Sequence, residues 1–275
     1  MIVTDTMPAA MGRRRAFVPT MGALHDGHRQ LMRVAREQVG GDGDVVVSVF
    51  VNPLQFGANE DFDAYPRTID ADIASCEAEG VDILYVPSVE RVYGSQPSIT
   101  VQPGKLGEEL EGASRPGHFA GMLTVVAILL HQVAPEVAVF GEKDYQQLEL
   151  VRRMCRDLSF PYSILGVETV READGVARSS RNVYLSEQDR LRAGAIPRAL
   201  EAGVAAAGLG ADGVKAAATA PLVDAGLTID YVEVRGRDLG EPPASGEARL
   251  LIAVRAGATR LIDNCRVVLG GDDAA

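Results

Sequence analysis

The chain is poor in the residues that disulfide-rich, zinc-binding and membrane-spanning proteins need. Its 275 residues include three cysteines, Cys76, Cys155 and Cys265, and their scattered positions give no paired spacing. Such thiols fit a reducing compartment and argue against a disulfide framework or a zinc site. The longest apolar run, near Met122–Leu130, falls far short of the roughly 20 residues that a membrane helix needs. No secretory apolar segment follows Arg13–Arg15, and we therefore expect a soluble cytoplasmic protein.

Positive charge is also scarce. The chain has 27 Lys and Arg against 38 Asp and Glu, a formal net charge of −11, which argues against nonspecific binding of nucleic acid. A protein with this charge must gather its cations locally to bind an anionic ligand, so single Lys and Arg positions are informative. Hydrophobic residues make up 47% of the chain, as in ordinary globular proteins, and the length allows one large or two modest domains.

Strand-like and helix-like patterns alternate through the first two thirds of the chain. Short apolar, β-branched runs predict strands, and the longer mixed patterns between them predict helices. Because the strands are almost continuously apolar, we expect an α/β fold, a parallel sheet with helices on both faces. The predicted strands are Ala16–Val18, Val45–Val51, Ile83–Val86, Val137–Phe140 and Ser163–Val167, and the predicted helices are Arg29–Val39, Ile69–Glu79, Phe119–Val133 and Tyr145–Leu158.

The pattern changes near Val170, so we divide the chain into domains of residues 1–169 and 170–275. Helical patterns come first in the second part and strand-like runs follow, which predicts a smaller α+β domain. Its predicted elements are an Ala-rich helix opened by a Ser186–Asp189 capping box and ending near Gly208, a helix over Val214–Ala225, and strands over Ile229–Val234, Leu250–Val254 and Leu261–Val268.

The first candidate site is the segment Pro19–His28, which follows a predicted strand and opens a predicted helix. Its glycines allow backbone to approach a ligand, and a helix N-terminus offers N–H groups to a phosphate. His25 and His28, three residues apart, would face one side and stabilise charge that develops on phosphates. The plainer interpretation is a strand-to-helix turn with two surface histidines.

Polar residues also gather where other predicted strands end, and ligands of parallel sheets bind beyond the carboxyl ends of the strands. Asn52 and Gln55 follow one strand and would hydrogen-bond a hydroxy acid or a carboxylate; alternatively, Asn52 caps a strand end. Lys143 follows Gly141 at a helix start, where a cation is unfavourable without an anionic partner. That partner would be a phosphate, or simply Glu142 or Asp144.

Three further groups of residues could bind anions or metal. The segment Arg178–Arg181 sets two serines between two arginines, which suits a triphosphate, although an exposed basic linker would look the same. Arg115 precedes an apolar helix and would hold an anion or remain solvated. Oxygen ligands for Mg²⁺ are available, unless they are simply solvated, from Asp61, Asp63, Asp70 and Asp72.

Taken together and in this order, these segments resemble the pantoate–β-alanine ligases, over nearly the whole chain and most strongly from Val18 to Leu185. The His-x-x-His loop alone is shared with adenylyl-transferring enzymes and class I aminoacyl-tRNA synthetases. The full set is more specific, and it comprises Pro19–His28, Phe50–Phe56, Tyr65–Arg67, Arg115–Phe119, Gly141–Gln147, Arg171–Gly175 and Ser179–Asn182.

The resemblance implies a Rossmann-like nucleotide-binding domain, a mobile C-terminal lid domain and a homodimer. It also implies a two-step reaction with ATP and Mg²⁺. The carboxylate of (R)-pantoate attacks the α-phosphate of ATP to give pantoyl adenylate and pyrophosphate, and the amine of β-alanine then displaces AMP to give pantothenate. Neither nucleic acid nor a membrane is an expected partner.

The resemblance also assigns roles to single residues. Catalysis is expected from His28 and His25, with Lys143 and Arg181 as the phosphate cations. Substrate contacts are expected from Gln55, Gln147, Asn52, Tyr65 and Arg115. Apart from the resemblance, its carboxylate makes Asp72 the predicted metal contact. The residues implied to hold ATP are Met21, Gly22, Ala23, Leu24, His25, Asp26, Gly27, His28, Gly141, Glu142, Lys143, Asp144, Val170, Arg178, Ser179, Ser180 and Arg181.

The chain departs from the family pattern at three places. Arg178 stands where relatives usually carry Met, and an added cation there would tighten ATP, slow its release or point to solvent. Ile128 occupies a region where relatives usually place a Lys. The stretch Asp70–Asp72 carries fewer carboxylates than some relatives, which leaves any protein ligand of Mg²⁺ open.

Three other functions account for these residues less well. A nucleotidyltransferase for a phosphorylated substrate should carry cations around Asn52–Phe56, where this chain has neutral amides. A non-catalytic nucleotide-binding protein would tolerate the loss of His28, Lys143 or Arg181, yet all are present. A metal-binding protein built on His25 and His28 lacks further well-spaced ligands.

Overall fold

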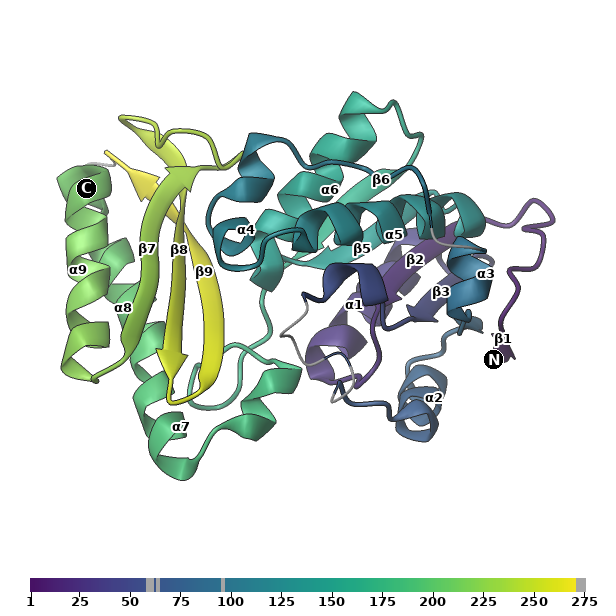
Figure 1. Cartoon of the computed structure of the whole chain (residues 1–275), viewed down its shortest axis with the longest axis horizontal. Helices are drawn as coiled ribbons and strands as arrows, with labels where there is room; N and C mark the ends of the chain where they lie inside the picture. The colour runs from purple at the N-terminus through teal and green to yellow at the C-terminus, as the bar shows by residue number, and fades with distance from the viewer. Residues whose placement is uncertain (58–61, 63–64, 95–96, 271–275) are drawn as a thin grey trace. The chain divides into compact units, whose positions relative to one another are not determined.

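The computed structural model describes residues 1–57, 62, 65–94 and 97–270. The chain divides into two compact units: Met1–Glu142 with Gln146–Glu168, and Lys143–Tyr145 with Thr169–Ala275. The first contains a six-stranded sheet and the second a three-stranded sheet (Figure 1). The predicted α/β fold with a smaller α+β part is confirmed.

The sheet of the first unit is parallel throughout, with strand order β1-β4-β3-β2-β5-β6. The predicted strands all form, and β1 at the sheet edge is added to them. The bounds are β1 (Ile2–Thr4), β2 (Arg15–Thr20), β3 (Asp44–Val49), β4 (Ile83–Tyr85), β5 (Val137–Gly141) and β6 (Ser163–Val167).

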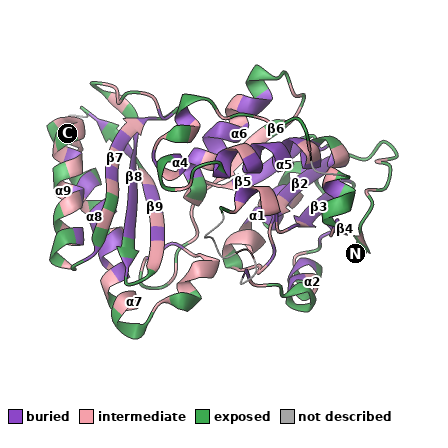
Figure 2. Ribbon diagram, in the orientation of Figure 1, coloured by how far each residue is buried: buried purple, intermediate pink, exposed green. Residues whose placement is uncertain are grey.

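Helices cover both faces of this sheet. On one face, Leu31 and Met32 of α1 (Asp26–Val39) and Cys76 of α2 (Ile69–Ala78) share a core with Ala16 and Val18 of β2. Phe17 lies between Ala16 and Val18 on β2, so its side chain points to the opposite face of the sheet, where it is fully buried. That face is covered by α5 (His118–Val133) and α6 (Tyr145–Asp157) (Figure 2). The remaining elements of this part of the chain are α3 (Val89–Tyr93), α4 (Glu111–Ser114) and the 3-10 turns η1 (Pro53–Gln55), η2 (Lys105–Glu108) and η3 (Glu142–Asp144).

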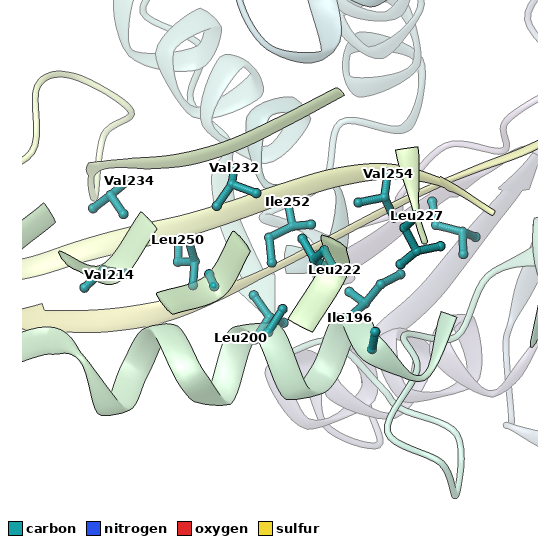
Figure 3. Packing of buried hydrophobic residues seen from close by; sticks show 14 of the residues in the cluster. Ile196, Leu200, Val214, Leu222, Leu227, Val232, Val234, Leu250, Ile252 and Val254 are labelled. Carbon is teal, nitrogen blue, oxygen red and sulfur yellow. The ribbon is translucent and has the colours of Figure 1, made fainter. Parts of the chain in front are cut away.

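The second unit packs helices against one face of an antiparallel sheet of order β7-β8-β9. Figure 3 shows its core, in which Leu200 and Leu222 of the helices meet Leu250 and Ile252 of the sheet. The bounds are η4 (Ser180–Tyr184), α7 (Glu187–Ala193), α8 (Ala195–Ala205), η5 (Ala207–Leu209), α9 (Gly210–Asp224), β7 (Thr228–Gly236), β8 (Gly246–Ala256) and β9 (Thr259–Leu269).

The helical stretch predicted after Ser186 is interrupted at Gly194. The Ser186 side chain caps α7 by accepting the N–H of Asp189, as predicted. The chain then turns at Gly194 and restarts as α8, with Pro197 in its first turn. In one continuous helix Pro197 would lack the N–H for the carbonyl of Ala193, whereas in a first turn that N–H is not needed.

Candidate active site

The loop between β2 and α1 brings His25 and His28 together. His25 is the N-cap residue of α1, and its Nδ1 accepts the N–H of Gly27 at 3.1 Å. The Nδ1 of His28 accepts the N–H of His25 at 3.2 Å. The two imidazoles therefore form a reciprocal capping box, with ring centroids 4.0 Å apart.

These hydrogen bonds set the tautomer of each ring. A ring nitrogen that accepts a backbone N–H carries no proton, so the proton of each neutral imidazole lies on Nε2. Both side chains thus carry an N–H group on Nε2 beside the N-terminus of α1. Such donors are suited to the oxygens of a bound phosphate.

Asp72 of α2 holds the backbone of the same loop. Asp72 is 2% exposed, and its carboxylate accepts the N–H of Leu24 at 2.8 Å and that of Ala23 at 3.1 Å. The loop needs this support because Ala23 has a φ of +51°, which is unfavourable for a residue with a side chain. Gly22 has a φ of +85°, and a Cβ there would lie 2.9 Å from Oδ2 of Asp72.

Of the four acidic residues predicted as metal ligands, the structure describes Asp70 and Asp72. Both oxygens of Asp72 are bonded to the loop, and Asp70 is exposed on α2. Asp61 and Asp63 lie outside the described residues. Among the residues that the structure does describe, no three His, Cys, Asp or Glu side chains gather as metal ligands.

Asn52 and Gln55 meet directly after β3, around the 3-10 turn η1. Asn52 is 1% exposed, and its Nδ2 donates to Oε1 of Gln55 at 3.0 Å and to the carbonyl of Gly121 at 3.2 Å. Its Oδ1 accepts the N–H of Leu54. The Nε2 of Gln55 lies 3.2 Å from Sδ of Met21, a weak acceptor. Asn52 therefore fixes the turn, and Gln55 extends toward the histidine loop.

This turn is supported by Tyr93, which the sequence did not single out, and by His118, which lies in the Arg115–Phe119 motif but had no predicted role. The hydroxyl of Tyr93 donates to Oδ1 of Asn52 at 2.6 Å, and burial raises the pKa of Tyr93 well above its ordinary value. His118, at the start of α5, donates from Nδ1 to the carbonyl of Gln55 at 2.9 Å. Nη1 of Arg115 lies 3.0 Å from Nε2 of His118. Arg115 and His118 thus hold the backbone that carries the Gln55 side chain.

The other predicted substrate residues occupy different surroundings. Tyr65 is buried beside the ring of Phe56, with centroids 5.9 Å apart. Gln147 lies half-buried on α6. Its neighbour Gln146 is buried and structural, because it bonds the carbonyls of Leu106 and Glu109.

The second unit holds the predicted phosphate cations. Lys143 lies in η3, with Nζ 3.8 Å from a carboxylate oxygen of Asp144. This long ion pair corresponds to one of the plainer alternatives for Lys143, and at such a distance it is weak. Gly141 ends β5, and Glu142 begins η3.

Glu172 contacts residues in and next to the segment Arg178–Arg181. The carbonyl of Val170 accepts the N–H of Arg178 at 2.8 Å, and the guanidinium of Arg178 lies 3.5 Å from Glu172. Glu172 also accepts from Nδ2 of Asn182 at 2.7 Å and from Arg190 at 2.8 Å. Arg178 therefore points to a carboxylate of its own chain.

Short-range capping shapes the remaining part of this segment. Ser179 is the N-cap residue of η4, and its Oγ accepts the N–H of Arg181 at 3.3 Å; Ser180 begins the turn. Burial would raise the pKa of Asp174, but its hydrogen bond and charge interaction with Arg190 outweigh burial and lower it. The segment thus forms a capped 3-10 turn, beside which Glu172 and Asp174 make ion pairs with arginines.

The whole chain was compared with known proteins. The model of a family described as pantoate-beta-alanine ligase matches residues 3–266. The chain belongs to this family. The match spans every site segment described above, so the enzyme is a ligase of pantothenate biosynthesis.

Curated relatives agree with the family match. The chain is 56% identical to pantothenate synthetase of Saccharopolyspora erythraea over 262 residues, covering 95% of this chain and 86% of the relative. It is 58% identical to pantothenate synthetase of Nocardia farcinica over 261 residues, covering 94% and 81%. Both cover most of the relatives' own length, so the ligase assignment concerns the enzyme as a whole.

Solved structures of the family share the fold. Pantothenate synthetase from Thermus thermophilus has a TM-score of 0.89 at 44% identity, covering 96% of this chain and 99% of that one. Pantoate-beta-alanine ligase from Francisella tularensis, solved with beta-gamma ATP and beta-alanine, has a TM-score of 0.80 at 32% identity, covering 96% and 97%. Among the described residues of this ligase, none of the helices has the length and hydrophobicity that a membrane crossing requires.

Proposed function

We propose that the protein condenses (R)-pantoate with β-alanine in an ATP-dependent reaction that passes through pantoyl adenylate. The observation that carries the proposal is that Nδ1 of both His25 and His28 accepts a backbone N–H at the N-terminus of α1, which assigns the ring proton to Nε2. The Francisella tularensis relative in complex with beta-gamma ATP and beta-alanine supports the choice of substrates.

The first step joins two anions. A carboxylate oxygen of pantoate attacks the α-phosphorus of ATP, and the bond to the bridging oxygen breaks to release pyrophosphate. Such a step needs alignment and charge stabilisation more than a protein nucleophile. Donors from His28 and His25 would stabilise the phosphate oxygens, and Met21–His28 would line the nucleotide.

Gln55 is the proposed pantoate contact. Its Nε2 is directed at the thioether of Met21, and a pantoate oxygen would be a stronger acceptor than this sulfur. Asn52, Arg115 and His118 act behind it by fixing η1. Gln147 and Tyr65 complete the proposed substrate set.

In the second step the amine of β-alanine attacks the acyl carbon of the adenylate. The bond from that carbon to the phosphate oxygen breaks, AMP leaves, and the amine loses a proton as the amide forms. No cysteine is needed, and burial raises the pKa of Cys76 to about 12, which keeps its thiol unreactive.

The second unit is proposed to supply cations to the nucleotide. Lys143 and Arg181 would bind phosphate oxygens, with Ser179 and Ser180 beside them, and the backbone of Val170 would contact adenine. Arg178 has Glu172 as its partner and is assigned a supporting role. A lid function of residues 170–275, a homodimer and a cytoplasmic location remain predictions of the family resemblance.

Mg²⁺ is proposed to enter with ATP. Magnesium commonly binds to substrate phosphates and retains several waters. The acidic residues of the described chain do not form a cage for it, and Asp72 is bonded to the histidine loop. We assign no catalytic step to a protein-held metal.

ATP–pyrophosphate exchange tests the proposal. Purified protein with Mg²⁺ and without β-alanine should exchange labelled pyrophosphate into ATP only when D-pantoate is added. Addition of β-alanine should then yield pantothenate and AMP in equal amounts. Absence of exchange at every pantoate concentration, in protein that binds ATP, would contradict the adenylate route and favour a nucleotidyltransferase or a regulatory protein.

A further inference from the structure

The C-terminal sheet holds the segment that carries Lys143. Nδ2 of Asn264, on β9, donates to the backbone carbonyl of Lys143 at 2.9 Å. Asn264 is 3% exposed. Residues Lys143–Tyr145 accordingly belong to the second unit, although Glu142 and Gln146 on either side belong to the first. A distant strand thus fixes the backbone of a proposed phosphate-binding lysine.

Arg249, on β8, contacts both Asn264 and Tyr145. Its Nε donates to Oδ1 of Asn264 at 2.7 Å, and its guanidinium carbon lies 4.0 Å from the ring centroid of Tyr145. The hydroxyl of Tyr145 donates to the carbonyl of Arg237 at 2.9 Å. One cation therefore contacts both Asn264 and the aromatic residue at the other end of the Lys143–Tyr145 segment.

Burial makes these contacts informative. Arg249 and Tyr145 are both buried, and a buried guanidinium or amide is costly unless it is hydrogen-bonded. Apolar side chains occupy neighbouring positions of both strands, as at Leu250 and Leu261. The sheet keeps Arg249 and Asn264 at positions where their polar groups point to the segment of Lys143.

We propose that Asn264 and Arg249 are positioning residues for Lys143, an inference that rests on the proposed function. Asn264 fixes the Lys143 carbonyl, and Arg249 orients both the Asn264 amide and the Tyr145 ring. The Lys143 side chain, 19% exposed, then starts from a fixed backbone toward the phosphates of ATP. Neither residue needs to touch a substrate to affect its binding.

The substitution Asn264→Asp keeps the hydrogen bond with Arg249 and removes the one to the Lys143 carbonyl. The new carboxylate retains an oxygen for Arg249, but it places an oxygen against the Lys143 carbonyl in place of the amide donor. ATP binding is measured by titration calorimetry in four proteins: the unchanged enzyme, Asn264→Asp, Lys143→Ala and the double variant. We expect Asn264→Asp to weaken ATP about tenfold when Lys143 is present and less than about twofold in the Lys143→Ala background.

A matched variant controls for general destabilisation. Val254 is fully buried in the core of the same sheet, and Val254→Ala should lower the melting temperature without this coupling to Lys143. An Asn264→Asp effect of equal size in both Lys143 backgrounds, or no effect in either, would overturn the proposal.

The test is independent of the ligase reaction. Pantoate-dependent exchange by the unchanged enzyme decides the proposed function, whereas the ATP-binding cycle decides the role of Asn264. If the protein binds ATP but does not catalyse pyrophosphate exchange, the proposed reaction is refuted. The ATP-binding cycle then still tests whether Asn264 positions Lys143.

Discussion

A carboxylate oxygen of Asp72 lies 2.8 Å from the backbone nitrogen of Leu24, and its other oxygen binds the N–H of the preceding residue, Ala23. Helix α2 thereby determines the shape of the loop that carries both histidines. An acidic residue beside a nucleotide loop resembles a metal ligand in sequence. Its bonds show that it organises the loop backbone, and the metal contact of Asp72 stays a prediction.

Asp72→Asn should slow the adenylate half-reaction without changing the requirement for magnesium. The amide has one acceptor oxygen, so one loop N–H loses its partner at a cost of about 1–2 kcal/mol, or roughly tenfold in rate. Pyrophosphate exchange measured across a Mg²⁺ titration checks this. The exposed Asp70 provides the control Asp70→Asn. A large shift in half-saturating Mg²⁺ for Asp72→Asn would instead identify Asp72 as a metal ligand.

His28→Asn should separate capping from catalysis. The Asn oxygen can take the place of Nδ1 and accept the N–H of His25, but no donor remains at the position of Nε2. We expect exchange to fall about 10²–10³-fold with little change in melting temperature. His28→Ala should lose the cap as well, costing about 1 kcal/mol more in unfolding free energy. Near-normal exchange by His28→Asn would rule out the Nε2 donor.

Arg178→Met introduces the residue that the family resemblance predicts at this position, and it should change the KM for ATP by less than about threefold. The Arg178 side chain is 37% exposed and pairs with Glu172, and such surface pairs contribute about 0–1 kcal/mol. Arg181→Met is the matched variant, for which we expect an increase of about tenfold or more. Similar increases in both variants, seen in steady-state kinetics, would show that Arg178 binds ATP directly.

The three thiols should remain unreactive near pH 8. Burial raises the pKa of Cys76 to about 12 and the pKa values of Cys155 and Cys265 to about 11, well above the ordinary value for a thiol. Iodoacetamide should therefore label the unfolded chain much faster than the native enzyme. Rapid native labelling with loss of activity would contradict this.

The same thiols predict a loss of stability in alkali. Their folded pKa values lie above the unfolded value, so above about pH 9 the unfolded chain releases protons that the folded chain retains. The free energy of unfolding should then decrease as pH rises from 9 to 11. Urea unfolding across this range measures the effect, and replacement of Cys76 by Ala should reduce its slope.

Local patterns were enough to predict most of the parallel sheet. Strands β2 and β3 are runs of buried apolar residues, and such runs are visible without any knowledge of partners. Strand β1 was missed because it has three residues, two of them exposed, and pairs at the sheet edge with the distant β4. The break at Gly194 was missed because the Ala-rich pattern continues across it.

The site was predictable where its residues are neighbours in sequence. His25 and His28 are three residues apart at a helix start, so their proximity follows from the geometry of an N-cap residue and the third residue of the helix. The bonds of Asp72, Tyr93 and His118 depend on where α2, α3 and α5 pack, and no local pattern contains that information. Sequence therefore indicated which side chains could do chemistry and not which ones hold them in place.

The chain crosses between its two units at residues 142–143, 145–146 and 168–169. A fragment that ends at residue 168 would retain Lys143 but lose Asn264 and Arg249. A fragment that begins at residue 169 would retain the small sheet without the segment that the sheet binds. A cut between residues 168 and 169 therefore leaves the second unit without its Lys143–Tyr145 segment. A chimeric enzyme that takes residues 169–275 from a relative must preserve the contacts that these residues make to Lys143–Tyr145.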